Sequence, residues 1–108
     1  MTEQERSAAE SLSELRRAID AVDGDLLAAL GRRLSLCAEV AAVKKAQGIP
    51  MMQPARVEEV KSRLAALAPA HGLRPQFVRR LYAAIIEEAC HLEDEIIEAA
   101  TGEDHEQT

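Results

Sequence analysis

Aromatic residues are nearly absent from this chain of 108 residues. It has no tryptophan, one tyrosine and one phenylalanine, while 47% of its residues are hydrophobic. Its core must therefore be built from leucine, isoleucine, valine and alanine, a composition that is typical of a helical bundle. The scarcity of aromatic side chains excludes base stacking, and a formal net charge of -6 opposes phosphate binding. Nucleic acid is therefore excluded as a partner.

Long apolar runs are also absent. No stretch approaches the roughly 20 residues of a membrane-spanning helix, and the first residues, MTEQERSAAE, lack the basic and apolar regions of a signal peptide. We therefore expect a cytoplasmic protein that does not enter a membrane. Cysteine is scarce too: Cys37 and Cys90 lie within helical patterns without the spacing of metal ligands, so we expect reduced thiols in the core.

The spacing of apolar residues predicts an all-α chain of three helices. The first is very long: it begins between residues 7 and 13, where serines can cap it, and runs to residue 45 or 46, before Gly48 and Pro50. The second is short, from Pro54 to residues 68–70, and the third is of medium length, from Pro75 to about residue 100.

The ends of the chain are polar. We expect residues 1–8 and 101–108 to be disordered tails on either side of one helical domain at residues 9–100.

The apolar stripe of the first predicted helix contains two cations. Arg33 and Lys44 continue its steps of three and four residues, so both point toward the core. A buried cation needs a negative partner. A core carboxylate beside Arg33, or a Lys44 that reaches solvent at the helix end, explains either one alone. Two cations on one seam favour an anion-binding site.

A carboxyl group interrupts the apolar face of the third predicted helix in the same way. Glu93 falls on the apolar face of that helix, either as the ion-pair partner of Lys44 or Arg33, or as a carboxyl that burial keeps protonated and able to donate a hydrogen bond to a ligand. Arg56, in the first turn of the second helix, either faces a ligand under the preceding loop or is an ordinary solvated arginine.

Arg16 cannot share a pocket with the seam cations of its own chain. Along a straight helix it lies about 25 Å from Arg33 and is turned from it by about 100°. If Arg16 also binds the ligand, it must serve the pocket of a neighbouring chain. A homodimer with crossing long helices would satisfy this geometry and bury the remaining apolar surface.

These residues resemble the AroQ class of all-helical chorismate mutases. The family pattern LxxLRxxIDxxDxxLLxLLxxR, followed by VxxxK, appears here as LSELRRAIDAVDGDLLAALGRR at residues 12–33 and VAAVK at residues 40–44. The resemblance extends over about residues 12–97. It implies an intertwined homodimer of three-helix chains with two equivalent sites.

The resemblance also implies roles for the charged residues. Arg16 would reach into the partner's site and, with Arg33, bind two carboxylates of a small-molecule substrate. Lys44 and Glu93 would be the catalytic pair that flanks the ether oxygen, and Arg56 would line the site. The implied reaction is a [3,3] sigmatropic rearrangement of an enolpyruvyl ether, which needs no covalent intermediate, metal or cofactor.

Three positions depart from the family pattern. Gln53 and Val57 stand where chorismate-specific members have an aspartate and a glutamate that bind the C4 hydroxyl, and Ala89 stands where they have a serine that helps to bind a carboxylate. The carboxylate-binding arginines and the ether donors are retained. This pattern implies the same chemistry on a different substrate.

Two segments resemble the family members that act on 4-amino-4-deoxychorismate in antibiotic pathways. They are PMMQPARVEEVK at residues 50–61 and CHLED at residues 90–94. We therefore predict an isomerase that converts 4-amino-4-deoxychorismate to 4-amino-4-deoxyprephenate. The alternatives are a chorismate mutase, an isochorismate pyruvate lyase and a non-catalytic helical dimer that binds a partner. Because the family's acids are missing, the C4 amine must be bound by the Gln53 carbonyl, by a loop carbonyl, or as a neutral amine.

Overall fold

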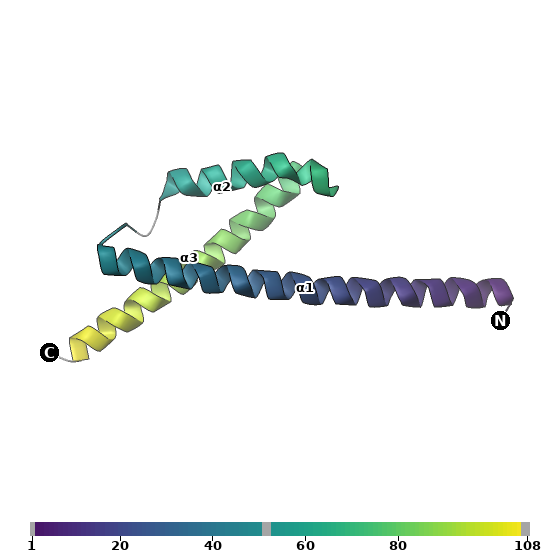
Figure 1. Ribbon diagram of the computed structural model, residues 1–108, viewed down its shortest axis with the longest axis horizontal. Coiled ribbons are helices and arrows are strands. Elements are labelled where there is room, and N and C mark those ends of the chain that lie inside the picture. Colours follow the sequence, from purple (N-terminus) through teal and green to yellow (C-terminus); the bar gives the residue numbers. More distant parts are fainter. Residues whose placement is uncertain (1, 51–52, 107–108) are drawn as a thin grey trace. The chain divides into compact units, whose positions relative to one another are not determined.

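Helices account for almost all of the computed structural model, which describes residues 2–50 and 53–106, with side chains described as far as residue 96. Met51 and Met52 of the loop lie outside these ranges. The elements are α1 (Glu3–Gln47), α2 (Pro54–Leu67), the short 3-10 helix η1 (Ala68–His71) and α3 (Pro75–Glu106) (Figure 1). No strand occurs in the described ranges. The prediction of an all-α chain with three helices, the first very long, is confirmed.

The start of α1 is set by a capping box. The Thr2 hydroxyl accepts a hydrogen bond from the Glu5 backbone N–H at 3.2 Å, and the Glu5 carboxylate accepts one from the Thr2 N–H at 3.1 Å. This reciprocal pair satisfies two backbone donors that helix starts otherwise leave unpaired. The helix therefore begins at Glu3, and residues 3–8, which the sequence assigned to a tail, are helical. At the other end of the chain, α3 continues past residue 100 to Glu106.

A left-handed glycine ends α1. Gly48 has a φ of 69°, a conformation that side chains disfavour. The turn lets the Ile49 N–H donate to the Lys44 carbonyl at 2.8 Å. The chain thus turns back at the end of α1, and the backbone of Ile49 is bonded to the helical turn that carries Lys44.

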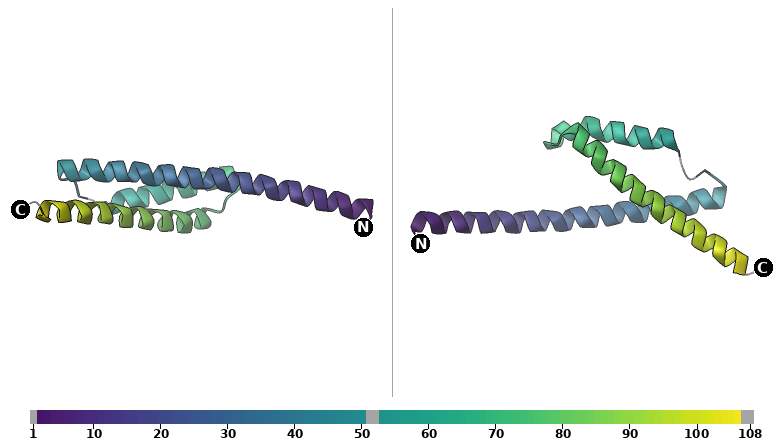
Figure 2. Two further views of the ribbon diagram at one scale, coloured as in Figure 1. Left: turned by 90° about the horizontal axis from the view of Figure 1, so that it is seen from below. Right: turned by 180° about the vertical axis from the view of Figure 1, so that it is seen from behind.

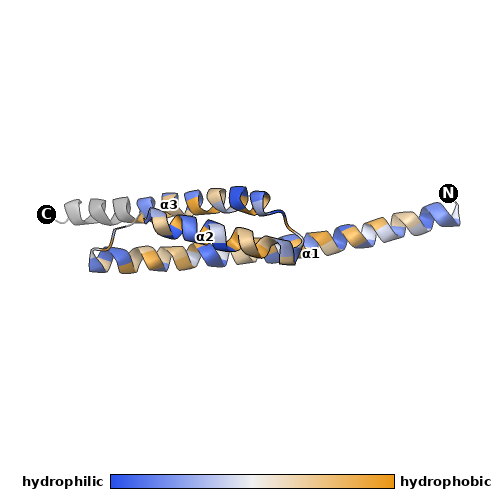
Figure 3. Ribbon diagram, turned by 90° about the horizontal axis from the view of Figure 1, so that it is seen from above, coloured by the Kyte–Doolittle hydropathy of each residue, from blue (hydrophilic) through white to orange (hydrophobic). Residues whose placement is uncertain are grey.

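The chain divides into two units, residues 1–33 and residues 34–108. The first unit consists of the N-terminal part of α1, on which hydrophobic and hydrophilic residues alternate (Figure 3). Its apolar stripe is exposed, with Leu15 and Val22 each 62% accessible and with Leu12, Ile19 and Leu26 also on the surface. An amphipathic helix gains most of its stability when such a stripe is covered.

The second unit contains the buried core. Its α2 and α3 meet at η1 (Figure 2), where Gly72 adopts a φ of 72° and the Leu73 N–H donates to the Ala68 carbonyl at 3.0 Å. Among the side chains described, those that are buried are all alanine or valine: Ala41, Val60, Ala65, Ala68, Val78 and Ala89. The leucines and isoleucines described, which were also expected in the core, are half-buried or exposed. No helix in the described part of the chain has the length and apolarity needed to cross a bilayer.

Polar contacts join α3 to α2. Arg79 on α3 donates from Nη2 to the Ser62 hydroxyl at 3.3 Å, and its Nη1 lies 3.9 Å from the Glu58 carboxylate on α2. A second ion pair links Glu58 to Lys61 at 3.2 Å. The Arg79 contacts link the exposed surfaces of α2 and α3, whereas the pair of Glu58 and Lys61 lies within α2.

Candidate functional site

An open cavity lies where α1 ends and α2 begins. Its volume is about 490 Å3, and the half-buried Lys44 and the exposed Gln53 both line it. The other lining residues are Leu36, Glu39, Val40, Val43 and Ile49. Mostly apolar walls with a few polar groups are the usual make-up of a small-molecule site. The cavity therefore brings together a predicted catalytic residue and a predicted substrate-binding residue.

The backbone of Gln53 sets the start of α2. Its carbonyl accepts hydrogen bonds from the Arg56 N–H at 3.0 Å and the Val57 N–H at 3.2 Å, while its side chain takes no part in the cap. Pro54 follows at the first helical position, where its missing N–H costs nothing. Because the carbonyl does the capping, the side-chain amide of Gln53 remains available to a ligand in the cavity.

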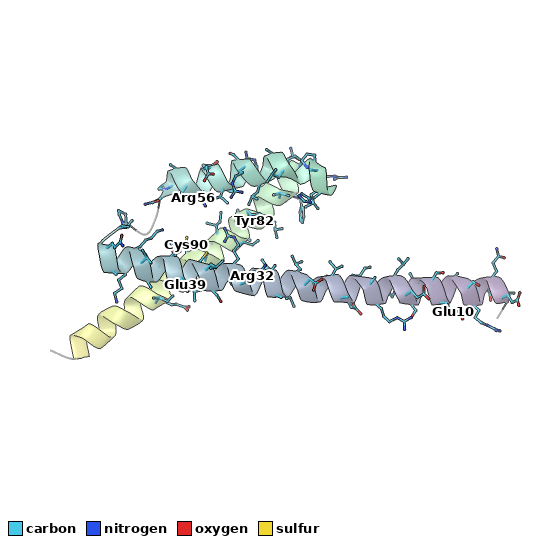
Figure 4. All side chains as sticks on the ribbon, in the orientation of Figure 1. Glu10, Arg32, Glu39, Arg56, Tyr82 and Cys90 are labelled. Carbon is cyan, nitrogen blue, oxygen red and sulfur yellow. The ribbon has the colours of Figure 1, made fainter. Side chains whose placement is uncertain are left out.

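Cys90 links the two predicted catalytic residues. Burial raises the pKa of the Cys90 thiol, the nearby charges of Glu93 and Asp94 raise this pKa further, and the charge of Lys44 opposes the shift. Lys44 on α1 and Glu93 on α3 are thus both within electrostatic reach of one thiol. Neither cysteine forms a disulfide bond, and both are half-buried, so Cys90, marked on α3 in Figure 4, is not deep in a core.

Sequence reasoning missed this position of Cys90, although one signal was available. Cys90 precedes Glu93 by three residues, a spacing that places both side chains on the same helix face.

The raised pKa of Cys90 predicts a shifted alkylation profile. In a Cys37→Ser variant, which leaves Cys90 as the sole thiol, we expect reaction with iodoacetamide to rise at higher pH than for an unstructured peptide thiol, because burial and carboxylate charge favour the neutral thiol. Adding Glu93→Gln should move the midpoint to lower pH, since one repelling charge is removed. Mass spectrometry of the rate against pH measures both effects.

A matched control tests that assignment. Glu88 is an exposed glutamate on the same helix and is not among the groups that act on Cys90. Glu88→Gln should leave the alkylation midpoint unchanged. An equal shift in the Glu88 and Glu93 variants would show that net charge, and not proximity of Glu93, controls the thiol.

Arg56 does not line the cavity. This residue, at the start of α2 in Figure 4, forms an ion pair with Glu59 one turn later, and both side chains are largely exposed. The other oxygen of Glu59 lies 3.6 Å from Nε of Arg63. Glu59 is therefore shared by two arginines, and it competes with a ligand carboxylate for the guanidinium of Arg56.

The remaining predicted site residues lie in both units. In the second unit, Val57 on α2 is half-buried, and Ala89 on α3 is 5% exposed and offers only a methyl group. In the first unit, Arg16 is exposed and Arg33 is half-buried. The second unit by itself thus carries the cavity, the thiol and the two predicted catalytic residues.

A known protein family matches the part of the chain that carries these residues. The pattern of the type II chorismate mutase family matches residues 15–94, a range that includes every predicted site residue. The 4-amino-4-deoxychorismate mutase of Streptomyces venezuelae is 44% identical over 96% of this chain and 98% of its own length. The enzyme of the same name from Streptomyces pristinaespiralis is 43% identical over 84% of this chain and 70% of its own.

A more distant relative carries a different name. The chorismate mutase of Methanocaldococcus jannaschii is 29% identical over 82% of this chain and 90% of its own length. Relatives with either substrate in their names are therefore similar to this chain over most of its length. On the family match and on these identities, the chain belongs to the type II chorismate mutase family.

Proposed function

We propose that this isomerase converts 4-amino-4-deoxychorismate to 4-amino-4-deoxyprephenate. The observation that carries the proposal is the likeness to the two Streptomyces enzymes of that name, which extends over most of the chain. The departures at Gln53 and Val57 support it, because neither residue supplies the carboxylate that the resemblance assigns to a C4 hydroxyl. The expected site of action is the cytoplasm.

Lys44 and Glu93 act on the ether oxygen in this proposal. As the ether C–O bond breaks and the new C–C bond forms, negative charge grows on that oxygen. The Lys44 ammonium donates a hydrogen bond to it, and Glu93 donates one whenever its carboxyl carries a proton. Donors held in place before the reaction stabilise the transition state more than the ground state, and this difference accelerates the rearrangement. The proximity of both residues to Cys90 supports this pairing.

The arginines bind the two substrate carboxylates. We assign this role to Arg33 and to Arg16 of the partner subunit, with Arg56 as a further cation at the start of α2. Holding both carboxylates selects the compact conformer in which the two reacting carbons face each other, which lowers the entropic part of the barrier. The exposed apolar stripe of the first unit supports a homodimer in which a second copy covers it.

Substrate specificity is tested by offering the purified protein one substrate at a time. We expect 4-amino-4-deoxychorismate to lose its cyclohexadiene absorbance and to yield 4-amino-4-deoxyprephenate. Turnover of chorismate alone would show that the substrate assignment from Gln53 and Val57 is wrong. Release of pyruvate from isochorismate would identify a lyase. No turnover of any of the three by an intact, folded protein would identify a binding module.

Glu59 competes with the substrate for Arg56. Because Glu59 offsets the charge of Arg56 and occupies one of its nitrogens, Glu59→Gln should lower KM about two- to fivefold at low ionic strength, as expected for an exposed ion pair. The kcat should stay nearly constant, and the gain in KM should shrink as salt screens the pair. Steady-state kinetics at two salt concentrations measure both effects.

Glu58→Gln is the matched control for this prediction. Glu58 pairs with Lys61 and Arg79 and does not contact Arg56. Its replacement should leave KM and the salt dependence as in the wild type. An unchanged or raised KM in the Glu59 variant would contradict competition for Arg56.

A further inference from the structure

Among the described residues, one that lines the cavity beside Lys44 is acidic, Glu39. It is the only acidic side chain among the residues that line this cavity, and it comes from the same helix as Lys44 (Figure 4). Glu39 is exposed, and no ion pair of Glu39 occurs among the described residues. The carboxylate is therefore available to a ligand that occupies the cavity.

The proposed substrate needs such a group. Its ether oxygen and its amine are attached to adjacent ring carbons, so the residue that binds the amine must lie near the residue that binds the oxygen. Lys44, the proposed donor to the ether oxygen, lines the cavity together with Gln53, so we expect the group that binds the amine among the residues that line the same cavity. Gln53 offers a neutral carbonyl, which accepts a hydrogen bond but does not balance the charge of an ammonium. The Lys44 cation makes that imbalance worse, because like charges repel.

We propose that Glu39 is the specificity-determining residue that binds the C4 ammonium of the substrate. This inference rests on the proposed function and explains how an amine is bound where Gln53 and Val57 replace the acids. The Glu39 carboxylate accepts a charge-assisted hydrogen bond from the ammonium, a contact stronger than one between neutral groups. It also offsets the charge of Lys44 next to the amine. The Gln53 side-chain carbonyl supplies a second acceptor in the same cavity.

The expected signature is a change in preference between two substrates. Glu39→Gln keeps the size of the side chain and removes its charge. For 4-amino-4-deoxychorismate we expect KM to rise about 10- to 100-fold, the range for losing a hydrogen bond to a charged group, with kcat nearly unchanged. A hydroxyl at C4 carries no charge, so kcat/KM for chorismate should change by less than about threefold. Parallel steady-state assays of both substrates on one preparation give the ratio.

Two further variants separate binding from a structural role. Glu39→Asp keeps the charge and should restore part of the preference for the amino substrate. Glu88→Gln removes an exposed glutamate of α3 that does not line the cavity, and it should leave both substrates unaffected. Circular dichroism checks that every variant is helical.

Each alternative outcome overturns the role of Glu39. If the wild type converts the amino substrate and Glu39→Gln leaves its KM unchanged, the role is wrong and the proposed function stands. Equal losses for both substrates would indicate that Glu39 serves the fold. If the wild type does not convert 4-amino-4-deoxychorismate at all, the proposed function fails and this role fails with it.

Discussion

Replacing Lys44 with methionine should lower kcat/KM about 10²- to 10³-fold, the loss typical of removing one preorganised donor to a developing oxyanion. Methionine keeps an unbranched apolar side chain at this half-buried position on α1, so the helix should persist. Most of the loss should appear in kcat, because charge grows on the ether oxygen only as the bond breaks. Steady-state kinetics with the amino substrate measure it.

The neighbouring Lys45 supplies the control. Lys44 and Lys45 both lie in the last turn of α1, where either cation complements the helix dipole. Lys45 is exposed and does not line the cavity, so Lys45→Met should change kcat/KM less than about twofold. A loss of similar size in both variants would show that helix-end charge matters and would remove Lys44 from the chemistry.

The helical architecture could be predicted because its signals are local. Apolar residues at steps of three and four marked the helices, and Gly48, Pro54, Gly72 and Pro75 marked most of their ends. The start of α1 was missed for a physical reason. The capping box at Thr2 and Glu5 lies before the apolar stripe begins, so periodicity carries no signal there and the two reciprocal hydrogen bonds decide the boundary.

The site was predictable only where a charge stood out from its surroundings. Lys44 and Glu93 were proposed as site residues because they interrupt apolar seams, and Gln53 because it departs from a family pattern. Glu39 occupies an ordinary polar position and is one of 19 acidic residues in the chain. What distinguishes it is the cavity, whose shape depends on the Gly48 turn and on the path of the chain to Gln53. Spacing along one helix does not contain that information.

Mixing two inactive variants should restore activity if Arg16 serves the partner's site. We expect Arg16→Ala and Lys44→Met homodimers each to be strongly impaired, since one lacks a carboxylate-binding group and the other a catalytic donor. In a mixed dimer, the subunit with Arg16→Ala retains its own Lys44 and receives Arg16 from the other subunit, so one of two sites is intact. Random exchange of equal amounts should therefore recover about a quarter of wild-type activity.

A second mixture tests whether the recovery reflects shared sites. Arg33 and Lys44 act in the site of one and the same subunit in this arrangement, so mixing Arg33→Ala with Lys44→Met leaves no intact site in any dimer. This mixture should stay inactive when its subunits are exchanged by the same procedure as in the first mixture. Recovery in both mixtures would place Arg33 as well as Arg16 across the interface. Recovery in neither, with subunit exchange verified by mass spectrometry, would contradict a role for Arg16 in the partner's site.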